Sequence, residues 1–161
     1  MILELQNIDP QRVAAIDSNG DKLVYADITL LSQQICANIP ERSLCFLLVE
    51  NNIGGIAWTM SMLESHKLVP LILNVKTEDS LYQQLLDTYK PSYICAPTHV
   101  TLDGEIMDSQ FGYQLCKVSD NLCMLHPELS HLLPTSGSTG SPKLVRHKYE
   151  NIEAAGLNIS T

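Results

Sequence analysis

The sequence predicts an α/β fold, with one layered domain over residues 1–161 in which helices flank a largely parallel sheet. Two observations predict this fold class. Helix-like and strand-like patterns alternate along the chain, which is typical of parallel strands joined by right-handed crossovers. The strand-like segments are short, continuous apolar runs, as expected for strands that are buried on both faces. The length also fits a single domain with a sizeable core.

The first part of the chain supplies a helix, a strand and a second helix. Residues 23–39 predict a helix because apolar side chains recur there at helical spacing, and residues 43–49 (SLCFLLV) predict a buried strand. Residues 52–67 predict the second helix, in which Gly54 and Gly55 would let a neighbouring backbone approach closely. The apolar stripe of the first helix is Ile28, Leu31, Ile35 and Ile39, and that of the second is Ile53, Ile56, Ala57, Met60 and Leu63.

A strand and a third helix follow. Residues 68–73 (LVPLIL) predict a strand, and Pro70 predicts that it is an edge strand or an irregular one, because proline cannot donate to the ladder. Residues 78–91 predict a helix with an apolar stripe, ended by a proline. Ser80 and Gln83 have the spacing of a capping box at its start.

The remaining elements are shorter. Residues 92–96 (SYICA) predict another strand, whereas residues 97–128 have a weak pattern and predict only short strands or loops. Residues 131–135 predict a brief strand, and residues 148–160 predict a final helix. Since strands and helices continue to alternate, this part of the sequence supports the same fold class.

The composition is that of a globular, acidic chain. Lys and Arg number 10 against 18 Asp and Glu, which gives a net charge of −8. Because phosphate backbones are held mainly by Lys and Arg, this balance argues against nucleic acid or an anionic membrane as a partner. Any anion that the chain binds must therefore be held by a local arrangement. No apolar run is long enough to span a membrane, and no signal-peptide pattern is visible.

The cysteine pattern predicts reduced thiols and a cytoplasmic location. The cysteines are odd in number, form no C-x-x-C pair, and in several cases lie in apolar runs. Buried thiols therefore explain them better than a disulfide framework or a metal site. The histidines lack the spacing of metal ligands, and we predict no metal-binding residues. The cysteines are Cys36, Cys45, Cys95, Cys116 and Cys123.

Residues 135–143 (TSGSTGSPK) form the least ordinary segment of the chain, and lie between the brief strand and the final helix. Gly137 and Gly140 permit positive φ, which lets backbone N–H groups turn towards an anion, and Lys143 adds a positive charge. Hydrogen bonds to a charged group are worth about 1.5–3 kcal/mol each, so three or four could hold a polyphosphate. The hydroxyl donors are Ser136, Ser138, Thr139 and Ser141.

Two other interpretations of this segment are less favoured. A Gly/Ser linker should separate two domains, yet only a short helix candidate follows Lys143. A Walker-type loop requires G-x-x-x-x-G-K-[ST], a spacing that is absent here. The basic run after Leu144 is predicted to be an exposed part of the helix start, and consists of Arg146, His147 and Lys148.

The segment TSGSTGSPK, followed by Val145, resembles the phosphate-loop signature of the adenylate-forming enzymes. This superfamily comprises acyl-CoA synthetases, luciferases and the adenylation domains of nonribosomal peptide synthetases. Most of residues 20–97 are similar, more loosely, to the family's early helices and strands. The sequence departs from the signature at Leu144, where the family usually has glycine, and at Tyr149, where it often has histidine.

The resemblance implies an ATP- and Mg²⁺-dependent ligase. In this family ATP and a carboxylate give an acyl-adenylate and pyrophosphate, and the acyl group usually passes to a thiol such as CoA or a carrier protein. The family's magnesium glutamate, ribose-binding aspartate and catalytic lysine are expected beyond residue 161, so the chain is expected to be an N-terminal part that is inactive alone. The residues implied to hold the ATP phosphates are Thr135, Ser136, Gly137, Ser138, Thr139, Gly140 and Lys143.

Two alternatives to a ligase stay open from the sequence. One is a non-catalytic α/β module that binds a nucleotide or phosphate, and the other is a structural domain in which the Gly/Ser segment is only a connector. Neither the acyl substrate nor the thiol acceptor is predicted, and no catalytic residue is assigned.

Overall fold

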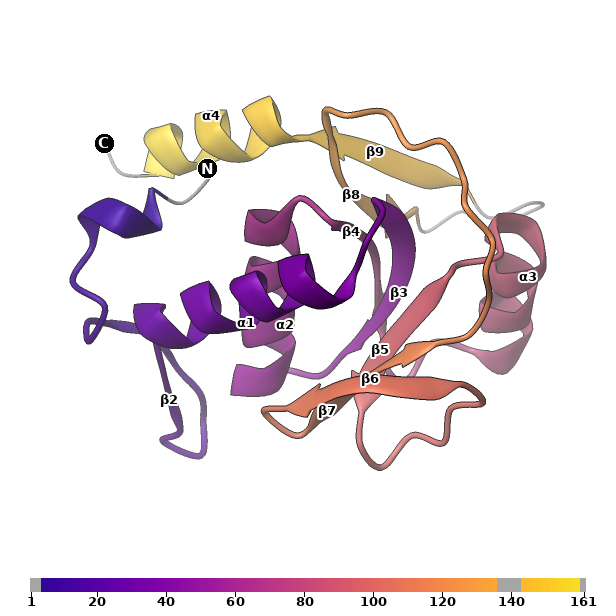
Figure 1. The fold of residues 1–161 in the computed structure, drawn as a ribbon, viewed down its shortest axis with the longest axis horizontal. Coiled ribbons are helices and arrows are strands. Elements are labelled where there is room, and N and C mark those ends of the chain that lie inside the picture. Colours follow the sequence, from indigo (N-terminus) through magenta and orange to yellow (C-terminus); the bar gives the residue numbers. More distant parts are fainter. Residues whose placement is uncertain (1–3, 136–142, 160–161) are drawn as a thin grey trace.

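The computed structural model describes residues 4–135 and 143–159, of which 156–159 are described by their backbone only. Seven strands form one sheet in the order β6-β7-β5-β3-β4-β8-β9 (Figure 1). A separate two-stranded sheet, β1-β2, lies near the N-terminus. The strands of the large sheet are β3 (Ser43–Val49), β4 (Leu68–Asn74), β5 (Tyr93–Pro97), β6 (Glu105–Gln110), β7 (Tyr113–Lys117), β8 (Leu129–Pro134) and β9 (Leu144–Lys148).

The predicted fold class is confirmed, with a difference at the two ends of the sheet. The inner strands β5, β3, β4 and β8 are parallel, whereas β6–β7 and β8–β9 pair antiparallel. The β6–β7 turn consists of Phe111 and Gly112, which both have positive φ, at 52° and 72°. Such a turn matches the twist of a two-residue hairpin, so these strands pair locally and need no crossover helix.

Helices cover both faces of the sheet (Figure 1). The helices α1 (Tyr25–Asn38) and α2 (Ile53–Ser65) pack side by side on one face, and α3 (Asp79–Tyr89) packs on the other. The fully buried Trp58 of α2 donates its indole N–H to the carbonyl of Gln110, 3.1 Å away. After β9 the chain continues into α4 (Tyr149–Ile159).

The sequence patterns predicted the first helices well. The four apolar residues predicted to face inward from α1 are buried, and β3 has the predicted bounds. A Cβ on Gly54 would collide with the carbonyl oxygen of Phe111, and one on Gly55 would lie 2.6 Å from the carbonyl oxygen of Glu50. The close backbone approach predicted at these two glycines is therefore confirmed.

The stripe predicted for α2 is partly wrong. Ile56 is 40% exposed, whereas Met62, which lies outside the predicted stripe, is fully buried. The reason is that α2 packs against the sheet and against α1 at once, so its buried surface is wider than one stripe.

Pro70 does not lie on an edge strand, so the first alternative of that prediction is wrong. It pairs in register with Cys45 of β3, and β4 also has β8 as its other neighbour. In the described part of the chain, the β4–β8 ladder is registered at a single pair, Leu71 with Leu132. A short ladder of this kind requires few backbone donors, which explains how an inner strand accommodates a proline.

The capping box predicted for α3 is also wrong. The N-cap is Glu78, which makes no side-chain capping bond, and Ser80 already lies within the first turn. Gln83 instead donates to Asp87 Oδ1, one turn later, over 3.0 Å. The spacing of Ser80 and Gln83 was correct for a box, but the helix starts one residue before Ser80.

The N-terminal elements were not predicted. They are a 3₁₀ turn, η1 (Leu5–Asn7), and the hairpin of β1 (Val13–Ile16) and β2 (Lys22–Val24). Asp17 shapes the hairpin turn, because its Oδ1 accepts from the backbone N–H groups of Asn19 and Asp21. The Asn19-Gly20 pair, a common hairpin signal, was the feature of the sequence that could have revealed it.

The cysteines are free thiols throughout, and all five lie in the described residues. Cys45, Cys95 and Cys116 are buried, which confirms the prediction for them, and burial raises the pKa of each thiol. Cys36 is exposed, and its Sγ donates to the carbonyl of Ser65. Within residues 4–135 and 143–159, no helix has the length and apolar character required to cross a membrane.

Candidate functional site

The carboxyl ends of the parallel strands define the candidate site. Because β3, β4, β5 and β8 run in the same direction, the turns that follow them lie at one edge of the sheet. Ligands of open α/β sheets usually bind at this edge. The turns begin at Glu50 after β3, at Val75 after β4, at Thr98 after β5 and at Thr135 after β8.

The two ends of the predicted phosphate-binding segment are joined. The backbone N–H of Thr135 donates to the carbonyl of Lys143 over 2.9 Å, and Thr135 Oγ1 donates to the same oxygen over 3.1 Å. Both side chains are exposed. Of the predicted phosphate ligands, Ser136, Gly137, Ser138, Thr139 and Gly140 lie outside the described residues.

The segment connects two strands, which corrects the prediction that it leads from a strand into a helix. Pro134 pairs with Leu144, and the antiparallel ladder continues along β9 before α4 begins at Tyr149. The basic residues from Arg146 to Lys148, predicted at the helix start, therefore lie on β9. Five residues without strict alternation gave too weak a signal, because β9 is stabilised by pairing with β8.

Two histidines hold the hairpin of β8 and β9 together. His131 and His147 are paired across the ladder, and their rings stack with centroids 4.5 Å apart and planes 3° from parallel. The buried Ser130 donates its hydroxyl to the carbonyl of His147 over 2.9 Å. Burial, and then the charge of His147, lower the pKa of His131 to about 4. The His131 ring is therefore neutral at pH 7.

Arg42 fixes the start of β8. Its guanidinium donates to the carbonyl of His66 over 3.1 Å, to that of His126 over 2.7 Å, and to that of Leu129. These carbonyls belong to the end of α2, to the loop before β8, and to β8 itself. One side chain thus connects the end of α2 to residues 126–129, which are far away in the sequence.

The turn after β4 places a second cation at the same edge. Asn74 Oδ1 accepts from the N–H of Lys76 over 2.8 Å, and the Asn74 carbonyl accepts from the N–H and hydroxyl of Thr77. Lys76 is exposed, and β4 is the direct neighbour of β8 in the sheet. The sequence patterns did not single out this residue, although its position after a strand at the carboxyl edge could have indicated it.

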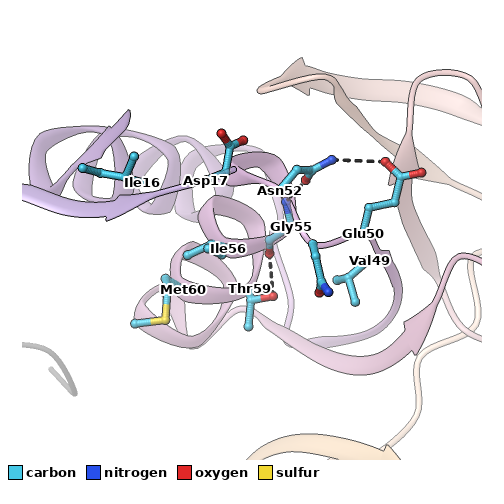
Figure 2. A pocket seen from close by; sticks show the side chains of 10 residues that line it. Ile16, Asp17, Val49, Glu50, Asn52, Gly55, Ile56, Thr59 and Met60 are labelled. Atoms are coloured by element: carbon cyan, nitrogen blue, oxygen red, sulfur yellow. Dashed lines mark hydrogen bonds between the residues drawn. The ribbon is translucent and has the colours of Figure 1, made fainter. Parts of the chain in front are cut away.

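The turn after β3 borders a hollow of about 510 Å³. Figure 2 shows Ile16, Ile56 and Met60 on one side of it and Glu50 on the other. Glu50 Oε2 accepts from Asn52 Nδ2 over 3.1 Å, and Glu50 Oε1 lies 3.5 Å from His99 Nε2. Asp17 also lines the hollow, and among the described residues no Lys or Arg does. Carboxylates repel phosphate, so the Thr135–Lys143 end of the edge suits a polyphosphate better.

The described residues contain no cluster of metal-ligating side chains. Within residues 4–135 and 143–159, no group of three or more His, Cys, Asp or Glu side chains could hold a metal ion. Mg²⁺ prefers carboxylate and phosphate oxygens. None of these residues is therefore assigned as a magnesium ligand.

The sequence matches no protein-family model, nor any curated protein. The structure, in contrast, resembles solved adenylate-forming enzymes. The o-succinylbenzoate coenzyme A synthetase of Bacillus subtilis, in complex with AMP, has a TM-score of 0.66 and 15% identity over 99% of this chain and 46% of that chain. The N-terminal subdomain of Klebsiella oxytoca NpsA has a TM-score of 0.66 and 18% identity, over 96% of this chain and 42% of that one.

Apo MatB from Rhodopseudomonas palustris gives a similar result, with a TM-score of 0.69 and 14% identity over 98% of this chain and 36% of that chain. The chain thus spans less than half the length of these solved structures. At such low identity the likeness shows the fold. The protein therefore has the fold of part of the N-terminal subdomain of adenylate-forming enzymes, as the resemblance of its sequence predicted.

Proposed function

We propose that this chain is the N-terminal part of an ATP-dependent, AMP-forming ligase. The ligase would activate a small-molecule carboxylate as an acyl-adenylate and pass the acyl group to CoA or another thiol. The shared fold supports the proposal, since solved structures with this fold hold AMP or the acyl-adenylate intermediate. The free thiols are in keeping with a cytoplasmic enzyme.

The observation that carries the proposal is the position of the segment from Thr135 to Lys143. It follows a parallel strand at the carboxyl edge, and its ends are joined by hydrogen bonds. In the proposed enzyme it holds the β- and γ-phosphates. Lys143 suits this role, because its exposed ammonium group makes no ion pair or hydrogen bond within the described part of the chain.

The chemistry explains why such a cradle would help. A carboxylate oxygen attacks the α-phosphorus of ATP, a new C–O–P linkage forms, and the bond to the bridging oxygen of pyrophosphate breaks. Negative charge then accumulates on the leaving pyrophosphate. Positive charge and aligned hydrogen-bond donors stabilise that charge in the transition state. This chain would therefore supply the pyrophosphate side of the site.

The test is pyrophosphate and ATP binding to the 161-residue chain, measured by calorimetry. Replacing Lys143 by Ala is expected to weaken binding by roughly tenfold, because one charge-assisted contact is lost. Lys90→Ala is the matched control, since Lys90 is an exposed lysine just after α3. Equal affinities for the wild type and both variants, or no binding at all, would count against the proposal.

A second candidate is a module that binds nucleotide or phosphate without catalysis. The closed segment after β8 supports it as well, because holding a phosphate between Thr135 and Lys143 does not by itself require catalysis. Both candidates predict the same binding result. The gene sequence downstream of Thr161 separates them, since a ligase also requires the ribose-binding, magnesium-binding and catalytic residues.

A further inference from the structure

A second, separate groove lies on the α3 face of the β8–β9 hairpin. Its volume is about 480 Å³, within the range of small-molecule sites. The buried Leu44 and Leu132 line it, together with the half-buried Leu129 and Leu144 and residues 123–126. The groove is therefore apolar for most of its length.

Arg146 lies at this groove and gives it a charge. The Arg146 side chain is exposed and makes no hydrogen bond or ion pair within the described residues. The remaining residues, 1–3, 136–142 and 160–161, include no Asp or Glu that could pair with it. No carboxylate of the described residues lines the groove either. By contrast, the guanidinium of Arg42 donates hydrogen bonds to three backbone carbonyls.

One residue of the groove lining is an exposed apolar side chain. Met124 is fully exposed, although it is apolar. An exposed apolar side chain beside an apolar concave surface is typical of a binding site. An anionic group would satisfy Arg146, whereas the leucines and Met124 can contact only an apolar body.

We propose that this groove binds an amphipathic monocarboxylate, with the carboxylate at Arg146 and an alkyl chain along the leucines. A guanidinium pairs well with a carboxylate, since two N–H groups can donate in parallel. The positive charge of Arg146 disfavours alkylammonium ions, and neutral apolar molecules gain no ion pair with it. The inference does not depend on the proposed function, because the lining excludes Thr135 and Lys143.

Cys123 provides a direct measurement of binding. It lines the groove and is half-buried, whereas Cys36 is exposed on α1. The rates at which a maleimide alkylates the two thiols are measured by mass spectrometry, with decanoate added below its micelle concentration. Decanoate is expected to slow alkylation of Cys123 several-fold and to leave that of Cys36 unchanged. Protection of both thiols alike, or of neither, overturns the proposal.

Charge is tested with matched ligands and variants. We expect 1-decanol to protect Cys123 much less than decanoate does, and Arg146→Gln to weaken decanoate binding by roughly tenfold. Arg12→Gln is the control, since Arg12 is an exposed arginine that does not line the groove. Arg146→Lys keeps the charge and should retain part of the affinity. Equal protection by decanol, or unchanged binding in Arg146→Gln, overturns the proposal.

Discussion

His131 connects the ionisation of one side chain to the stability of the hairpin that β8 and β9 form. Its ring is stacked on His147 between β8 and β9, and its pKa is lowered from 6.5 to about 4, by burial first and then by the charge of His147. In the folded state His131 is therefore protonated only near pH 4, whereas in the unfolded chain it is protonated near pH 6.5. Above pH 6.5 the imidazole is neutral in both states, so its lowered pKa does not change the free energy of unfolding. As the pH falls from 6.5 towards 4, His131 lowers that free energy progressively.

This cost gives a pH-dependent prediction. The wild-type protein loses unfolding free energy between pH 6.5 and 4, and His131→Phe should make this loss smaller by about 1–2 kcal/mol. This figure allows for solvent screening, because the His131 side chain is partly exposed. Urea denaturation of both proteins across this range measures the difference. Other groups also titrate in this range, including His66, whose pKa is lowered by burial and nearby positive charge. The comparison is therefore between the slopes of unfolding free energy against pH of the two proteins. Identical slopes would contradict the assignment.

At the scale of elements, Arg42 shows how side chains hold the candidate site in place. It connects the end of α2, the loop before β8, and the first residue of β8. Arg42→Ala should therefore destabilise the protein by about 2–3 kcal/mol, since three carbonyls lose a charged donor. Hydrogen exchange should become faster in β8 and β9, while the β6–β7 hairpin keeps its protection.

The control for Arg42 is Lys67→Ala. Lys67 also donates to a backbone carbonyl, that of Pro40, but its side chain makes only this one bond within the described residues. We expect Lys67→Ala to destabilise the protein less than Arg42→Ala does, and not to speed hydrogen exchange in β8. Uniform faster exchange in both variants would mean that Arg42 acts on global stability alone.

Elements were predictable where a segment carries its own signal. The helix α1 and the strand β3 were predicted because periodic or continuous apolar runs fix them locally. Pro70 gave a misleading signal, because whether a strand is inner or outer depends on neighbours that are distant in the sequence. The strand β9 was missed for the same reason, since its partner β8 determines it.

At the scale of the whole molecule, the candidate site was only partly predictable. The segment from Thr135 to Lys143 was evident from its composition, but its neighbours were not. Lys76 reaches the same edge because β4 adjoins β8, and Arg42 reaches β8 from a turn that precedes β3. Such proximity follows from sheet order, which local patterns do not encode.

The share of the solved structures that this chain spans leads to a prediction about the activity of the 161-residue chain. The chain spans 34% to 46% of them, and within its described residues no carboxylate cluster could hold Mg²⁺. We therefore expect no carboxylate-dependent exchange of labelled pyrophosphate into ATP by the 161-residue chain. Exchange that disappears in Lys143→Ala would show that these residues are sufficient for adenylation.

The hydrogen bonds between Thr135 and Lys143 have a consequence for how this protein can evolve. They join the end of β8 to the start of β9 through contacts that involve only Thr135 and Lys143. Insertions and substitutions at hairpin tips are tolerated well by folded proteins. Descendants could therefore change or lose the chemistry of this segment and still inherit an intact fold.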